Sequence, residues 1–320
     1  MKRFKNILYI FEGGVDQVSA MARAVTLAEN NQAELTVIDV IPGISRWKGM
    51  AGGGPDATDL QTAMVGVHIK GLEALIEPHR QRINIKREVL TGTAFLEIIY
   101  GVLRHGYDLV IKPAENPDFL GRLFGSVDMH LLRKCPCPVW LMKPQEKSNY
   151  ANILAAVDFD PLGPGVEEQD LNQQILGLAA SLALSDFATL NLAHAWNPFA
   201  EGAISTWENQ SASVTYVENE RLQHESGLYQ LGRWLRNRIG TEAYDYLSPR
   251  FHLPRGPAHK VIPVLAEKLG VDLIVMGTVA RTGISGLIIG NTAETILEQV
   301  QCSVLALKPA GFVSPVKLTT

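Results

Sequence analysis

Cysteines and long apolar runs are scarce in this sequence, and each scarcity excludes a class of protein. Only three of the 320 residues are cysteines: Cys135, Cys137 and Cys302. They form neither a CxxC motif nor an even framework of pairs, which favours a reducing compartment, so the predicted location is cytoplasmic. No stretch of about 18 uncharged apolar residues occurs, so we expect no membrane span. The basic start, Met1–Asn6, is soon followed by Glu12 and lacks a small-residue cleavage site, so we interpret it as the first strand.

An excess of basic charge is lacking as well. The chain has 29 Lys and Arg against 33 Asp and Glu, a net charge of −4, which argues against a nucleic-acid partner because such a partner requires a basic face. The eight histidines show no HxH or HxxxH spacing, so no metal site is predicted. No nucleophile–histidine arrangement and no carboxylate pair for Mg²⁺ can be recognised, so no catalytic residues are predicted.

The sequence contains an internal repeat. Asn6-Ile7-Leu8 recurs as Asn152-Ile153-Leu154, and each copy opens an apolar run that ends at an acid, Glu12 or Asp158. Further anchors recur in the same order at nearly constant separation: Tyr107–Ile111 as Val271–Val275, Gly125 as Gly290, Cys137 as Cys302, and Lys143-Pro144 as Lys308-Pro309. Such a series indicates two copies of one unit.

Each copy alternates strand-like apolar runs with helical patterns. This alternation predicts an α/β fold in which each copy forms a five-stranded, mainly parallel sheet with helices on both faces. We predict strands near 6–11, 34–40, 83–89, 107–112 and 138–143, and again near 152–157, 189–195, 249–253, 271–276 and 303–308. We predict helices near 15–30, 58–80, 93–104 and 126–133, and again near 167–184, 214–239, 257–269 and 291–299. The predicted domains are 1–146 and 147–312, followed by a tail at 313–320.

One loop of the second copy has the chemistry of an anion cradle. The apolar run Leu273–Met276 ends at Gly277, which allows a tight turn and the close approach of a ligand to the backbone. Gly290-Asn291-Thr292 then opens a helix, whose first N–H groups can donate to a phosphate. An ordinary strand-to-helix turn is the alternative. In such sheets a ligand lies beyond the carboxyl ends of the strands, where the strand order reverses.

The same loop resembles the signature of the universal stress proteins. Their pattern is Gly, two residues, Gly, nine residues, Gly, then Ser or Thr; here the corresponding residues are Gly277, Ala280, Gly290 and Asn291. Together with the repeat, the chain resembles the tandem, UspE-like members of the family. The resemblance implies two tandem Rossmann-like domains and a stress-response role.

The resemblance also implies a ligand site in the second copy. Asp158 and Ala195 correspond to positions around the adenosine of nucleotide-binding relatives. The positions that hold phosphates and ribose correspond to Met276, Gly277, Ala280, Gly290, Asn291 and Thr292. Arg281 is a candidate for the mouth of the site. The resemblance makes an ATP- or AMP-like molecule the candidate ligand. Ala280 and Asn291 depart from the pattern, and these departures weigh against tight ATP binding. No cofactor is expected to be required.

The first copy departs further from the pattern. Pro113 and Asn116 stand in place of the first two glycines, Glu12 in place of the acid, and only Gly125-Ser126 matches. Pro113 lacks the N–H that a phosphate cradle needs, so we expect no nucleotide here. Lys112 is either an anion contact or a lysine paired at the end of the sheet.

Three classes of function remain at this point. The leading one is a regulatory stress-response protein whose second domain binds a small nucleotide-like ligand without catalysis. The alternatives are a scaffold or a binder of a non-nucleotide ligand, and a nucleotide phosphohydrolase. The final apolar strands, Val139–Met142 and Val304–Leu307, are predicted to pair and make an intramolecular pseudo-dimer, because an uncovered apolar edge promotes aggregation. A homodimer is the alternative assembly.

Overall fold

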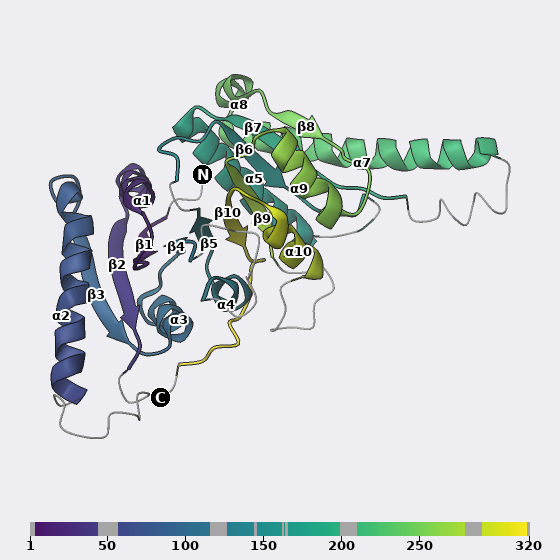
Figure 1. Ribbon diagram of the computed structural model, residues 1–320. Coiled ribbons are helices and arrows are strands. Elements are labelled where there is room, and N and C mark those ends of the chain that lie inside the picture. Colours follow the sequence, from purple (N-terminus) through teal and green to yellow (C-terminus); the bar gives the residue numbers. More distant parts are fainter. Residues whose placement is uncertain are drawn as a thin grey trace. The chain divides into compact units, whose positions relative to one another are not determined.

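The computed structural model describes residues 4–43, 57–115, 127–143, 146–161, 163, 166–198, 210–278 and 290–318. The chain divides into two compact units (Figure 1). The first unit, here the first domain, holds Arg3–Ser148 together with Phe312–Thr320. The second domain holds Asn149–Gly283 and Ile288–Gly311.

The first domain is a five-stranded parallel sheet with helices between its strands. The strand order is β3-β2-β1-β4-β5, and each neighbouring pair is parallel. Its elements in chain order are β1 (Asn6–Ile10), α1 (Val18–Asn31), β2 (Glu34–Ile41), α2 (Ala57–Ile76), the short 3-10 helix η2 (Glu77–His79), β3 (Ile85–Thr91), α3 (Ala94–His105), β4 (Leu109–Pro113), α4 (Val127–Lys134) and β5 (Val139–Met142).

The second domain repeats this topology. Its strand order is β10-β9-β6-β7-β8, again with parallel neighbours. Its elements in chain order are β6 (Asn152–Ala156), α5 (Val166–Asp186), β7 (Thr189–Ala193), α7 (Gln210–Ile239), α8 (Thr241–Leu247), β8 (Arg250–His252), α9 (Ala258–Lys268), β9 (Leu273–Gly277), α10 (Asn291–Gln299) and β10 (Ser303–Leu307).

The predicted fold class is confirmed. The central strands β4 and β9 are buried along almost their whole length, as expected of parallel strands covered on both faces, and this burial explains their continuous apolar runs. Sequence periodicity missed α8, a seven-residue helix in which Leu247 is the buried residue. One buried side chain gives too little pattern to detect. Of the helices in the described part of the chain, none is long and apolar enough to cross a membrane.

The sheet registers place the two copies in correspondence, residue by residue. Ile7 pairs with Leu109 in the first domain, and Ile153 pairs with Leu273 in the second. Leu109 therefore corresponds to Leu273, the first residues of β4 and β9. Counting onward along these two strands, Lys112 corresponds to Met276 and Pro113 to Gly277. The register pairs Asn6–Glu34 and Asn152–Thr189 make Glu34 correspond to Thr189. Counting onward in the same way, Asp39 corresponds to His194.

Both sheets reverse their strand order beside the first strand of the copy. In the second domain the chain runs outward from β6 to β7 and β8, and then continues on the other side of β6 with β9 and β10. The carboxyl ends of β6 and β9 therefore flank the place where ligands bind in such sheets. The ends of β1 and β4 flank the same place in the first domain.

Candidate functional site

In the second domain, Asp158 follows β6 and is held there by an amide side chain. Its main-chain N–H donates to Asn172 Oδ1 (3.2 Å), and Asn172 Nδ2 donates back to the Asp158 carbonyl (2.9 Å). Asn172 lies on α5 and is buried, whereas Asp158 is exposed. Because the clamp uses only main-chain groups of Asp158, it fixes the backbone that carries the carboxylate at the reversal point.

The end of β9 and the start of α10 form the other side of this place. Gly290 N–H donates to the Thr278 carbonyl (2.9 Å), so the residue after the end of β9 is joined to the residue before α10. Gly290 caps α10 and has no side chain that could accept from the first-turn N–H groups of the helix. Such N–H groups have no partner within a helix, so water or a ligand can accept from them.

Gly277 has a different role from the tight turn expected of it. It is the last residue of β9 and is not among the glycines with positive φ. A Cβ at Gly277 would lie 2.8 Å from Leu171 Cδ2, so the missing side chain makes room for Leu171 of α5. Packing between helix and sheet therefore accounts for this glycine.

Beyond β6 and β7, aromatic and imidazole rings pack together. Phe159 stacks on His194 with ring centroids 3.9 Å apart, and its ring also meets the backbone of α7 at Gly227, where a Cβ would be 2.3 Å from Phe159 Cε2. His194 Nε2 lies 2.9 Å from Nδ1 of His224 on α7. Trp196, two residues after His194, is buried beside His224. The members of this ring cluster on the sheet side adjoin Asp158 and Ala195 in the sequence, and His194 and Trp196 are buried.

The structure gathers most of the predicted site residues at one edge of the second-domain sheet. Asp158, Asn291 and Thr292 are exposed, Ala195, Gly277 and Gly290 are half-buried, and Met276 is buried within the sheet. Ala280 and Arg281 lie outside the described residues. Sequence reasoning missed Asn172 and the pairing of His194 with His224. The clamp has no sequence signal, because its first-domain counterpart, Gln17, stands at a different distance from the acid.

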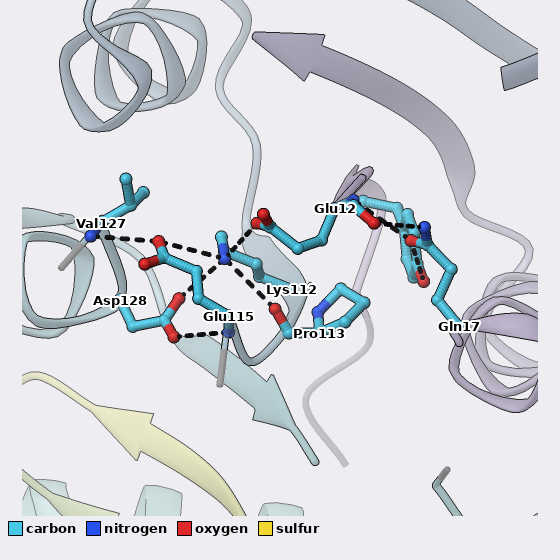
Figure 2. Close-up of polar contacts among 8 residues, drawn as sticks. Glu12, Gln17, Lys112, Pro113, Glu115, Val127 and Asp128 are labelled. Carbon is cyan, nitrogen blue, oxygen red and sulfur yellow. Dashed lines mark hydrogen bonds and ion pairs between the residues drawn. The ribbon is translucent and has the colours of Figure 1, made fainter. Parts of the chain in front are cut away.

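In the first domain, an ion cluster occupies the matching place (Figure 2). Lys112 Nζ lies 2.7 Å from Glu12 Oε2, 2.9 Å from Asp128 Oδ1 and 3.5 Å from Glu115 Oε1. The side chains of Lys112 and Asp128 are 2% and 3% exposed, and those of Glu12 and Glu115 are 26% and 30% exposed. Of the two readings of Lys112, the paired lysine at the end of the sheet is the one observed.

Two hydrogen bonds tie the chain beyond β4 to the start of α4. Glu115 N–H donates to Asp128 Oδ2 (3.2 Å), and Val127 N–H donates to Glu115 Oε1 (3.1 Å). A carboxylate therefore occupies the N-terminus of α4, while the glycine cap of α10 supplies none. Each helix also has one acid in its first turn, Asp128 in α4 and Glu294 in α10, so the two copies differ in the carboxylate that Glu115 adds at the start of α4.

The cluster perturbs two of its own pKa values. Burial disfavours the ammonium of Lys112, but the carboxylates of Asp128, Glu12 and Glu115 outweigh burial and raise its pKa. Burial, and next the charge of Asp128, raise the pKa of Glu115 against the opposing attraction of Lys112. The described residues contain no group of three or more ligating side chains suited to a metal ion.

Comparison with known proteins agrees with the repeat. The model of the universal stress protein family matches residues 3–143 and 149–308. Universal stress protein E of Escherichia coli K12 is 33% identical over 226 residues, which cover 70% of this chain and 68% of that protein. Universal stress protein E of Photorhabdus laumondii is 26% identical over 322 residues, which cover 99% of each chain.

Solved structures show the same fold. A crystal structure of a universal-stress-type protein from Pseudomonas aeruginosa UCBPP-PA14 matches with a TM-score of 0.68 at 27% identity, covering 96% of this chain and 94% of the other. A universal stress protein from Archaeoglobus fulgidus matches with a TM-score of 0.62 at 17% identity, covering 97% and 98% of the two chains.

Proposed function

Because this chain belongs to the universal stress protein family in both of its halves, we propose that it is a stress-response protein whose second domain binds a small anionic ligand of the adenine-nucleotide type as a regulatory signal. Proteins of this family are generally regulatory rather than catalytic, and the proposal includes no reaction. Its single strongest support is the glycine-capped start of α10, which lies at the reversal of strand order and whose cap residue places no side chain over the first-turn N–H groups.

The proposed ligand uses three features of the site. First-turn N–H groups of α10 donate to phosphate oxygens, and the helix dipole favours the negative charge. The carboxylate of Asp158, fixed by Asn172, accepts from a ribose hydroxyl or an adenine amine. The ring cluster of Phe159, His194, Trp196 and His224 supplies an apolar wall for a planar base.

A charge substitution at the start of α10 tests the proposal. Asn291 is exposed and is the first residue of α10, so Asn291→Asp places a carboxylate at the phosphate position. The new charge favours the helix by roughly 0.3–1 kcal/mol through its dipole. It should nevertheless weaken ATP, ADP or AMP binding by about tenfold, because like charges repel. The two effects have opposite signs, so loss of binding cannot be confused with loss of folding.

Calorimetric titration and thermal shift with ATP, ADP and AMP measure the effect. The matched control is Ser126→Asp at the equivalent sequence position of the first domain, which should leave nucleotide binding unchanged. Phosphate release in the same samples separates a binder from a phosphohydrolase. If all three nucleotides fail to stabilise the wild-type chain, the nucleotide-type ligand is excluded and the scaffold alternative is favoured.

A further inference from the structure

The ion cluster of the first domain contains more negative than positive charge. One lysine, with a charge of +1, meets three carboxylates, with a charge of −3 when all are ionised, so the cluster sums to −2. The charges come from separate segments of the chain: Glu12 follows β1, Lys112 lies in β4, Glu115 follows β4, and Asp128 lies in the first turn of α4. Like charges held this close in a partly buried site favour the uptake of a proton.

Glu115 is the carboxylate with the weakest compensation. Its oxygen is 3.5 Å from Lys112 Nζ, compared with 2.7 Å for Glu12 and 2.9 Å for Asp128. Its side chain is 30% exposed, so water can deliver a proton to it. Among the described residues, the charges that act on Glu115 are those of Asp128, Lys112 and Glu12, and burial and Asp128 together raise its pKa.

Glu115 also carries a structural connection. Its side chain accepts from Val127 N–H, and its own N–H donates to Asp128, so it joins the end of β4 to the start of α4 from both sides (Figure 2). A protonated Glu115 keeps a carbonyl oxygen that can accept from Val127. Its new O–H can donate to a neighbouring carboxylate, and one unit of repulsion is removed.

We propose that Glu12, Lys112, Glu115 and Asp128 form a proton-linked latch of the first domain, which takes up one proton at a higher pH than an ordinary glutamate does and then holds β4 and α4 together more tightly. The direction follows from linkage. A carboxyl group whose pKa is higher in the folded than in the unfolded protein binds more protons when folded, so stability decreases as the pH rises through the folded pKa. The stabilisation is complete below the ordinary pKa of 4.5. The first domain would thereby respond to acidification through a site that binds no nucleotide.

Hydrogen exchange of the full-length chain tests the latch. Mass spectrometry of peptides from β1, β4 and α4 gives their protection at pH 7.5, 6.5 and 5.5, for the wild type and for Glu115→Gln. The intrinsic effect of pH on exchange is the same in both chains and cancels in their ratio. We expect the protection of the wild type, relative to Glu115→Gln, to rise by about threefold or more between pH 7.5 and pH 5.5.

Two further variants make the test specific. Glu88→Gln changes an exposed glutamate of β3 and should follow the wild type at every pH. Asp128→Asn removes the largest neighbouring charge on Glu115, so the ¹³C carboxyl resonance of Glu115 should titrate at lower pH there than in the wild type. A protection ratio that stays constant with pH would overturn the latch, and so would a Glu115 resonance that titrates identically in the wild type and Asp128→Asn.

Discussion

Lys112 and Asp128 can be exchanged for the apolar pair that the second domain uses at equivalent positions. Lys112 corresponds to Met276 through the strand registers. Asp128 corresponds to Ala293, because each stands eleven residues before a register-matched strand residue, Val139 or Val304. Met276 and Ala293 are both buried. The chain therefore contains an ionic and an apolar solution for one site, and the substitutions Lys112→Met and Asp128→Ala convert the first into the second.

The single substitution Lys112→Met should be costly. It leaves the carboxylate of Asp128, which is 3% exposed, without its cation, and breaking a buried ion pair in this way costs about 3–5 kcal/mol. Glu12 and Glu115 are each about a quarter to a third exposed, so water can solvate them and their contribution is smaller.

The double substitution Lys112→Met/Asp128→Ala should recover most of this loss, because replacing both members of a buried pair by apolar residues is often close to neutral. The remaining cost is about 1 kcal/mol for the acceptor that Glu115 N–H loses. We therefore expect the double variant to be more stable than Lys112→Met by about 2 kcal/mol or more.

Pulse-labelling hydrogen exchange across a urea series, read from peptides of β1 and β4, reports the unfolding of the first domain in the intact chain. Lys86→Met is the matched control, since Lys86 pairs with Glu34 at the surface, where water screens the pair, and its loss should change the stability little. If the double variant is no more stable than Lys112→Met, the uncompensated charge of Asp128 does not cause the loss of stability in Lys112→Met, and the reasoning is refuted.

Two other predictions concern the clamp and the assembly. Asn172→Ala should destabilise the second domain by about 1–3 kcal/mol in urea unfolding, because the main-chain N–H and carbonyl of Asp158 both lose their hydrogen-bond partner. Gln17→Ala should do the same to the first domain, and no change in either would contradict the clamp. When expressed separately, residues 1–146 and 147–312 should self-associate and should recombine when mixed. The reason is that β5 and β10 are edge strands within their own domains and are entirely apolar apart from Ser303. A 1–146 fragment that stays monomeric at tens of micromolar by light scattering would contradict this edge pairing.

The sequence by itself determined the repeat, the fold class and the edge of the sheet at which to look. Strand runs such as Leu273–Met276 and anchors such as Lys308-Pro309 are local patterns, and local patterns predict secondary structure directly. The reversal rule then placed Asp158, Gly277 and Gly290 together before any contact was known. The sequence predicted a tight turn at Gly277, whereas the structure shows a glycine that makes room for Leu171. A glycine required for packing and one required for a turn look identical in a sequence.

Only the tertiary structure decided how the polar groups pair. Lys112 meets Glu12, which stands a hundred residues earlier in the chain, and Asp128, which lies on a helix, and His194 meets His224 from another element. Neither spacing nor periodicity encodes such pairs, since they depend on which strand ends adjoin in the sheet. The same topology holds an ammonium and three carboxylates in one copy and a glycine-capped helix start in the other. The difference arises because a buried charge is tolerated only where the fold brings its counter-charges within contact distance.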